Sequence, residues 1–149
     1  MSESINRVGE SFPQTADKPA SNANHLVREE KRQEVARAER FAQYLVECVC
    51  VQMNITAVAF HSGRRDRKIS RPRQIACWLL RNHPSAKFSY PVIGIVLKRD
   101  HTSIMYGVNA VHFRIVNGAG SGEDQKLAQR LCNMMALHGF KPFDVRTAR

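Results

Sequence analysis

The fold is decided at Lys98-Arg99-Asp100-His101-Thr102-Ser103-Ile104-Met105. This stretch predicts a tight turn that opens directly into a helix, with polar side chains from Asp100 to Ser103 on the first helical turn. Short polar side chains there can accept hydrogen bonds from the backbone N–H groups that lack a partner at a helix start. The same side chains can contact base edges when a helix N-terminus enters the major groove of DNA. A cap and a base-reading surface are both compatible with these residues.

The composition favours a binding protein with an acidic partner. The chain has 149 residues, enough for one domain with tails, and a formal net charge of +10. Such a charge favours a nucleic acid or an anionic surface as partner. The longest apolar run, Val92 to Leu97, is too short to cross a bilayer, and Met1 to Ala20 lacks the apolar centre of a secretory signal. We therefore expect a cytoplasmic protein without membrane contact.

Residues that would hold a metal or a cofactor do not occur at the required spacings. The four cysteines form no CxxC pair and share no ligand spacing with the six histidines, so we interpret them as buried free thiols. No GxxxxGK[ST] loop is present, and the glycine-rich stretch over residues 118–122 precedes two acids that would repel phosphate. His101 has no nucleophile near it in the sequence. The sequence thus predicts no metal, no cofactor and no enzymatic activity.

The first third of the chain predicts a tail and one long helix. Residues 1–24 are polar, with little to bury, and predict a disordered tail. From Leu26 the pattern becomes helical, and its first half carries nearly balanced charges, so we expect a solvated, ion-paired surface. The second half carries an apolar stripe that should dock onto a core. The stripe consists of Ala38, Phe41, Ala42, Leu45, Val49 and Met53.

Two capped helices are predicted before the deciding stretch. A short helix over residues 57–61 follows Asn54 or Thr56 as its cap. The next begins at Ser70-Arg71-Pro72, with Ser70 as N-cap and proline in the first turn, and ends near His83. Its inward residues are Ile75, Ala76, Leu79 and Leu80.

Short helix, tight turn and longer helix form the predicted helix-turn-helix over about residues 89–116. The short helix, residues 90–97, is capped by Ser89, and the longer one turns a single stripe inward. That stripe consists of Ile104, Val108, Val111 and Ile115.

The end of the chain predicts one more helix. Residues 117–149 comprise the glycine-rich linker and a helix over residues 124–138, which Gly139 stops and which turns Leu127, Leu131, Met134 and either Met135 or Leu137 inward. Because no strand-like alternation persists, the predicted fold class is all-α, with the helical domain over residues 25–116.

A basic run lies upstream at Arg64-Arg65-Asp66-Arg67-Lys68. Residues 64–81 hold seven basic side chains and one acid, a net charge of +6. A solvated loop is the plain interpretation. An excess of one sign made mostly of arginine instead favours phosphate or groove binding, because the planar guanidinium fits phosphate oxygens and narrow A·T minor grooves. The basic residues are Arg64, Arg65, Arg67, Lys68, Arg71, Arg73 and Arg81.

Taken together, these residues resemble the C-terminal DNA-binding domain of the DnaA-type bacterial chromosomal replication initiator. Four segments between about Thr56 and Ile115 carry the resemblance. They are Arg64-Arg65-Asp66-Arg67, Ser70-Arg71-Pro72-Arg73-Gln74-Ile75-Ala76, Ile93-Gly94 and Arg99-Asp100-His101-Thr102-Ser103-Ile104.

The resemblance implies contacts with double-stranded DNA at a box similar to TTATCCACA. Asp100, His101 and Thr102 would read bases in the major groove, and Arg65 would enter the adjacent minor groove. Backbone contacts, which set register without carrying sequence information, are the second set. That set comprises Arg99, Ser103, Arg81, Tyr90 and Pro91, with Arg64, Arg67 and Lys68 of the basic run.

Three departures from the family pattern bear on these expectations. The chain shows no motif for the family's ATP-binding domain, so we expect a stand-alone protein that occupies boxes without melting an origin. The turn Leu97-Lys98-Arg99 is one residue shorter than the aromatic and two glycines usual before the arginine, which can rotate the recognition helix. The loop before Ser89 is longer, and Asp66 places a negative charge where phosphate is expected.

The sequence therefore predicts a nucleoid-associated, sequence-specific DNA-binding protein that regulates transcription or modulates replication initiation. The alternative is a protein-interaction adaptor of that machinery, in which the charged N-terminal helix or the C-terminal helix binds a partner or a second copy and DNA contact is secondary.

Overall fold

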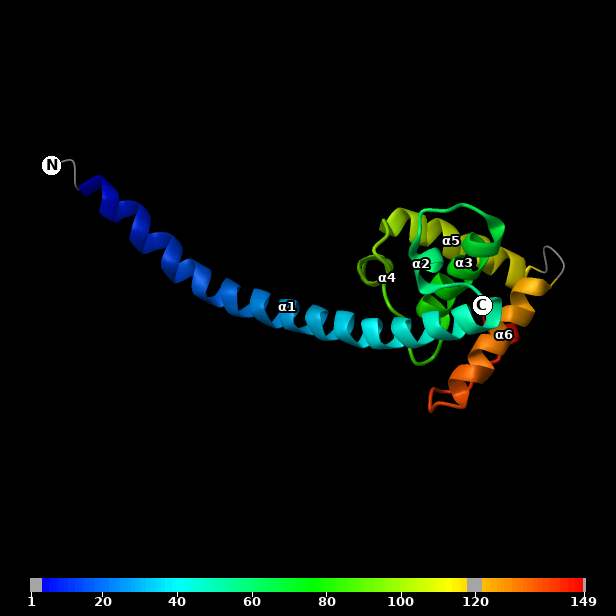
Figure 1. Cartoon of the computed structure of the whole chain (residues 1–149). Coiled ribbons are helices and arrows are strands. Elements are labelled where there is room, and N and C mark those ends of the chain that lie inside the picture. Colours follow the sequence, from blue (N-terminus) through cyan, green and yellow to red (C-terminus); the bar gives the residue numbers. More distant parts are fainter. Residues whose placement is uncertain (1–3, 118–121, 149) are drawn as a thin grey trace. The chain divides into compact units, whose positions relative to one another are not determined.

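The computed structural model describes the backbone of residues 4–117 and 122–148, and the side chains of residues 23–117 and 122–148. Within these ranges the chain is helical and contains no strand, which confirms the all-α prediction. No helix among them is both long and apolar enough to cross a membrane. The elements are α1 (Ser4–Met53), α2 (Ala57–His61), α3 (Arg67–Asn82), α4 (Tyr90–Leu97), α5 (His101–Val116), α6 (Glu123–Ala136) and the 3-10 helix η1 (Val145–Thr147) (Figure 1).

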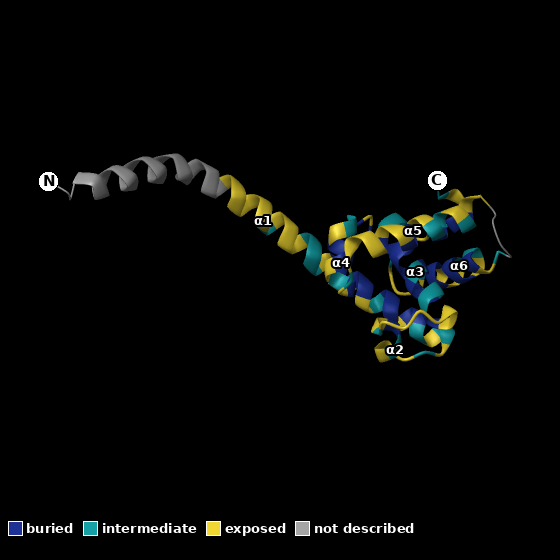
Figure 2. Cartoon of the chain, turned by 90° about the horizontal axis from the view of Figure 1, so that it is seen from above, coloured by how far each residue is buried: buried dark blue, intermediate teal, exposed yellow. Residues whose placement is uncertain are grey.

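Helix α1 belongs to two compact units, residues 1–34 and residues 35–149. In the first unit, residues 23–34 are mostly exposed and Arg32 pairs with Glu29 at 2.8 Å, which confirms the solvated surface (Figure 2). The helix starts at Ser4, earlier than the predicted start at Leu26. The side chains of residues 1–22 lie outside the described part, so the disordered tail over residues 1–24 stays a prediction.

The core of the second unit surrounds α3, which packs against α2, α4, α5 and α6. All four predicted inward residues of α3 are buried, and so is the whole predicted stripe of α5. Trp78 is fully buried in the middle of α3, and its indole Nε1 donates to His112 Nδ1 of α5 at 3.3 Å. The predicted stripe of α1 is buried as far as Val49, while Met53 packs half-buried against the cluster. The periodicity of these helices therefore predicted their inward faces correctly.

Helix α3 starts one turn earlier than predicted. Its N-cap is Asp66, whose side chain accepts from the Lys68 N–H at 3.1 Å and whose carbonyl accepts from the Ser70 N–H at 2.7 Å. Ser70 is thus inside the helix, and the prediction of Ser70 as cap was wrong. Pro72 lies beyond the first turn and leaves one carbonyl of the helix without its usual partner. The three hydrogen bonds that Asp66 accepts from the N–H groups of Lys68, Ile69 and Ser70, together with the burial of Ile69, favour the earlier start despite that loss.

The C-terminal segment completes the core. Helix α6 ends at Ala136 and Leu137 is 85% exposed, so Met135 rather than Leu137 is the inward residue. Beyond it, Phe140 packs edge-on against Phe41 of α1, with ring centroids 5.3 Å apart. No helical pattern is visible in the sequence of this segment, and η1 was not predicted.

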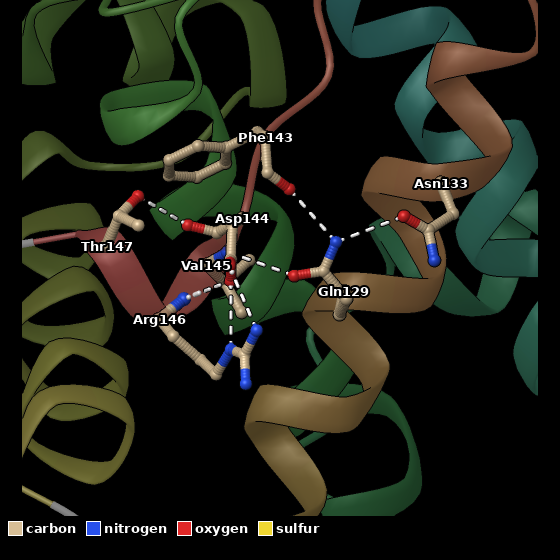
Figure 3. Close-up of polar contacts among 7 residues, drawn as sticks. All are labelled: Gln129, Asn133, Phe143, Asp144, Val145, Arg146 and Thr147. Carbon is tan, nitrogen blue, oxygen red and sulfur yellow. Dashed lines mark hydrogen bonds and ion pairs between the residues drawn. The ribbon is translucent and has the colours of Figure 1, made fainter.

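Polar contacts fix the C-terminal segment to α6 (Figure 3). Gln129 donates to the Phe143 carbonyl at 2.9 Å and accepts from the Val145 N–H at 3.0 Å, while Asp144 caps η1. At the other end of α6, Arg114 of α5 donates to the buried carboxylate of Asp124. The glycines of the predicted linker lie outside the described residues, apart from Gly122, the N-cap of α6.

The turn between α4 and α5 is tight because Gly94 has no side chain. Lys98 ends α4 in the left-handed conformation, with φ 56° and ψ 48°, and the Gly94 carbonyl accepts from the Arg99 N–H at 2.9 Å. A Cβ on Gly94 would lie only 2.7 Å from the Arg99 carbonyl oxygen. The α4 cap was predicted correctly, since Ser89 accepts from the Val92 N–H at 3.4 Å.

His83 is a fully buried cap at the C-terminus of α3. Its Nδ1 accepts from the Ser85 N–H at 3.0 Å, and its ring packs against Phe41 and Phe143. Its Nε2 has no hydrogen-bond partner among the described residues. Burial lowers the pKa of His83 to about 4, so the ring is neutral in the folded protein at neutral pH.

A substitution at Gly94 tests the close approach in the turn. Alanine normally stabilises a helix interior relative to glycine by roughly 0.5–1 kcal/mol. We expect Gly94→Ala to lower the free energy of unfolding instead, by about 1–3 kcal/mol, because the new methyl group would overlap the Arg99 carbonyl. Gly63→Ala is the matched control, since nothing lies within 4 Å of that position. Urea unfolding measures both, and a more stable Gly94→Ala variant would contradict the geometry.

The buried His83 predicts a specific pH dependence of stability. The folded pKa of about 4 lies below the unfolded value near 6.5, so the unfolded chain binds the proton first as the pH falls. We expect the free energy of unfolding to fall by about 2–3 kcal/mol between pH 7 and pH 4 from this residue alone. His83→Asn keeps an acceptor for the Ser85 N–H but does not titrate. Urea unfolding at both pH values should show a smaller decrease for the variant, and equal decreases would refute the assignment.

Candidate nucleic-acid interface

The N-terminus of α5 presents free polar side chains. Asp100 is the N-cap by its backbone, because its carbonyl accepts from the Ile104 N–H at 3.1 Å, but its side chain makes no capping hydrogen bond. The carboxylate is 66% exposed and lies 3.8 Å from His101 Nδ1. His101, Thr102 and Ser103 are exposed as well. Of the two roles open to this stretch, side-chain capping is therefore not used, and the acceptor of Asp100 is available to a ligand.

A groove of about 720 Å³ joins the start of α5 to the basic run. Its two walls come from α5 and from the loop between α2 and α3 (residues 62–66, the α2–α3 loop), with α3 between them. The lining includes Arg64, Arg65, Arg99, Thr102, Ser103 and Tyr106. Of the residues predicted to read the major groove, Thr102 thus shares this groove of the protein with Arg65, whereas Asp100 and His101 line a separate hollow.

The basic run itself is exposed along its whole length. Arg64 pairs with Asp66 at 3.3 Å, and both side chains are largely exposed. Arg65 lines the groove, whereas Arg67 and Lys68 lie on the first turn of α3. Asp66 therefore has a structural role, as the cap of α3, in a surface that remains net positive.

Arg73 of α3 binds the backbone of the α2–α3 loop and of the residues before it. Its side chain is buried, and its guanidinium donates to three backbone carbonyls: Phe60 at 2.9 Å, Arg64 at 3.2 Å and Ser62 at 2.8 Å. Burial, followed by the charge of Arg99, lowers the pKa of Arg73. Sequence analysis counted Arg73 only as a basic residue, because a bond to carbonyls up to 13 residues away leaves no local pattern.

Arg99 contacts the same loop as Arg73. Its Nη2 donates to the carbonyl of Ser62 and, at 3.5 Å, to that of His61. The residue is half-buried at the junction of α4 and α5. Phosphate contact by Arg99 stays a prediction, and in the free protein its guanidinium is directed at the loop. Burial and then the neighbouring charges of Arg99, Lys98 and Arg73 lower the pKa of His61.

The predicted contacts at the start of α4 lie beside α5 as well. Arg81 donates to the Phe88 carbonyl at 3.1 Å, and its guanidinium lies 4.4 Å from the centre of the Tyr90 ring. A second hollow of about 490 Å³ is lined by both Pro91 and His101. The structure thus brings Pro91 next to the predicted base-contacting residues, while Arg81 is engaged within the protein.

One exposed residue of the groove escaped sequence analysis. Tyr106 follows Thr102 by one helical turn, lines the groove and is 74% exposed. The spacing of four residues from Thr102 is the signal that places it on the same face.

Metal-ligating residues do not gather in the described part of the chain, where no three His, Cys, Asp or Glu side chains lie together. All four cysteines are free thiols: Cys48, Cys77 and Cys132 are buried, as predicted, and Cys50 is half-buried.

The residues around this groove are similar in sequence to known proteins. Residues 42–111 match the family described as bacterial DnaA protein helix-turn-helix. The "Chromosomal replication initiator protein DnaA" of Gloeobacter violaceus is 32% identical over 100 residues, which cover 66% of this chain and 22% of that protein. The proteins of the same name from Gluconobacter oxydans and Aromatoleum aromaticum are 37% and 33% identical over 79 and 70 residues.

The similarity is confined to part of each relative. The chain spans about a fifth of the length of the first relative, and 16% and 14% of the other two. The matched range contains the end of α1, helices α2 to α4 and α5 as far as Val111, and thus every residue that lines the groove. The chain therefore carries, over residues 42–111, a helix-turn-helix domain of the bacterial DnaA family.

Proposed function

We propose that this protein binds double-stranded DNA sequence-specifically, at sites resembling the initiator box, and so regulates transcription or modulates replication initiation. The observation that supports this most directly is the groove in which Arg65 lies with the exposed first turn of α5. The family assignment supports the same function, because the matched relatives carry the name chromosomal replication initiator protein. The proposed role is binding without catalysis, at the nucleoid in the cytoplasm.

In the major groove, the first turn of α5 would carry the base contacts. The free carboxylate of Asp100 suits an acceptor for the amino group of cytosine, and the methyl group of Thr102 suits the methyl group of thymine. His101 can donate or accept at a base edge. Because the side chain of Asp100 is not used as a cap, these contacts require no rearrangement of the helix start.

In the minor groove, the α2–α3 loop would supply Arg65. The side chain is exposed and lines the same groove of the protein as Thr102, so one docking pose can place α5 and the loop in adjacent grooves of a duplex. Arginine suits this position because a narrow A·T minor groove has an enhanced negative potential.

The remaining predicted contacts would hold phosphates and set the register. Arg67 and Lys68 are exposed on the first turn of α3, and Ser103 on that of α5. Tyr90 and Pro91 begin α4 beside the second hollow. A protein that occupies such boxes can repress a nearby promoter or compete with an initiator for its sites, which is the basis of the proposed regulatory role.

Fluorescence anisotropy with a box duplex and a scrambled duplex of equal length, at several salt concentrations, tests the proposal. We expect tighter binding to the box duplex at every salt concentration, with the affinity for both duplexes falling as salt rises because phosphate contacts release counterions. Equal affinities across the salt range would refute sequence specificity. A pull-down from nuclease-treated lysate tests the alternative: a stoichiometric protein partner retained there without DNA would favour the adaptor role instead.

Variants separate base contacts from general charge. We expect Thr102→Ala to relax base choice at its position by about 1–3 kcal/mol. Arg65→Ala should weaken binding to the box duplex. Arg130→Ala, which removes one exposed positive charge from α6 and lines neither hollow, is the matched control and should bind as the parent does. Box binding unchanged in the first two variants would remove the assigned roles.

A further inference from the structure

Two arginines from different helices converge on one backbone carbonyl. Arg73 Nη2 of α3 donates to the Ser62 carbonyl oxygen at 2.8 Å. Arg99 Nη2 donates to the same oxygen, although Arg99 follows Ser62 by 37 residues in the sequence. A carbonyl oxygen has two lone pairs, so both acceptor positions of Ser62 are used. Hydrogen bonds from a charged donor are about twice as strong as neutral ones.

Few other contacts hold the α2–α3 loop. Gly63 has no neighbour within 4 Å of its hypothetical Cβ, and the residues from Gly63 to Lys68 are exposed. The other hydrogen bonds of its first residues are short-range. Ser62 donates to the Ala59 carbonyl from its N–H at 3.2 Å and from its Oγ at 2.6 Å. Arg64 donates from its N–H to Ser62 Oγ at 3.4 Å and from its guanidinium to Asp66 at 3.3 Å. Asp66 joins the end of the loop to α3 as its cap, and among the described residues the bonds from Arg73 and Arg99 are those that hold the rest of the loop to α3 and to the start of α5.

We propose that Arg73 and Arg99 are positioning residues that fasten the α2–α3 loop to the start of α5, so that Arg65 and the first turn of α5 engage DNA as one rigid unit. This rests on the proposed function for its DNA part. Arg99 fits the role because it immediately precedes Asp100, so a bond from its side chain to Ser62 fixes the loop against the beginning of the recognition helix. Arg73 fits because its three carbonyl partners span the loop from Phe60 to Arg64.

The competing role for Arg99 is a direct phosphate contact. Its guanidinium would then have to leave the carbonyls of Ser62 and His61, and the loop would depend on Arg73 alone. The half-buried position of Arg99 between α4 and the loop favours the positioning role. The two roles differ in whether the loss of DNA affinity caused by changing Arg99 depends on the presence of Arg65. A double-mutant cycle measures this dependence.

The first test compares Arg65→Ala, Arg99→Ala and the double variant on the box duplex. If Arg99 acts by positioning Arg65, each single change weakens binding by roughly tenfold and the double variant binds about as the Arg65→Ala variant does. If Arg99 instead contacts a phosphate, the two losses of affinity multiply to roughly a hundredfold in the double variant. Changing Arg99 in the Arg65→Ala background would then also reduce the slope of log affinity against log salt concentration by about 0.9. Multiplying effects, or unchanged binding by Arg99→Ala, would overturn the proposal.

The second test needs no DNA. Backbone order parameters from NMR relaxation of the free, full-length protein report the mobility of residues 63–65. We expect values near about 0.85 in the parent protein and below about 0.6 in Arg99→Ala and in Arg73→Lys, which keeps the charge but loses the planar fork. Values for α6 should not change and serve as the internal control for folding. Unchanged loop values in both variants would overturn the proposal.

The two tests separate this proposal from the proposed function. Equal affinity of the parent protein for box and scrambled duplexes would refute sequence-specific binding, while the order parameters would still decide whether the two arginines hold the loop. A mobile α2–α3 loop in the variants, together with a double variant that binds the box duplex about as the Arg65→Ala variant does, would support both the positioning role and the proposed DNA binding.

Discussion

The surface at the start of α5 depends on the contact between Gly94 and the backbone of Arg99. A Cβ at residue 94 would stand 2.7 Å from the Arg99 carbonyl oxygen, so only glycine allows α4 and α5 to be joined this closely. Lys98 completes the turn in the left-handed conformation, at some conformational cost for a residue with a side chain. Because Arg99 and Asp100 follow at once, the turn sets both the direction of the Arg99 side chain towards Ser62 and the exposure of the first turn of α5.

The two aspartates of this region differ in how their carboxylates are used. Asp66 lies in the basic run but accepts from the Lys68 N–H and begins α3. Asp100 occupies the same kind of position on α5 and leaves its carboxylate free. A missing side-chain cap costs about 1 kcal/mol. Helices α2, α3 and α4 have side-chain caps, whereas α5 and α6 do not, so the free carboxylate of Asp100 agrees with the proposed role in DNA binding without requiring it.

Local rules predicted the parts of the fold that depend on local contacts. The stripes of α1, α3 and α5 and the caps Thr56 and Ser89 follow from spacing and short-range hydrogen bonds, and the structure has them. The start of α3 was misplaced because two cap signals, Asp66 and Ser70, stand four residues apart, and burial of Ile69 favours the earlier one. The groove was predictable as a set of residues, but the bonds that shape it were not. Arg73 and Arg99 reach carbonyls 11 and 37 residues away, and no periodicity encodes such a contact.

If the proposed function holds, fastening the α2–α3 loop to the start of α5 would change the binding free energy that a mismatched base costs. If the α2–α3 loop moved freely, Arg65 could keep its minor-groove contact while α5 shifted on an imperfect site, and ordering the loop would cost conformational entropy at each binding event. In the proposed complex, with Arg73 and Arg99 holding the loop, a misfit in the major groove would displace Arg65 as well, so one wrong base would weaken contacts in both grooves. The rigid link also lowers the ordering cost on the correct site. Hydrogen bonds that are already present in the free protein can in this way contribute to discrimination between DNA sequences, although they contact no base.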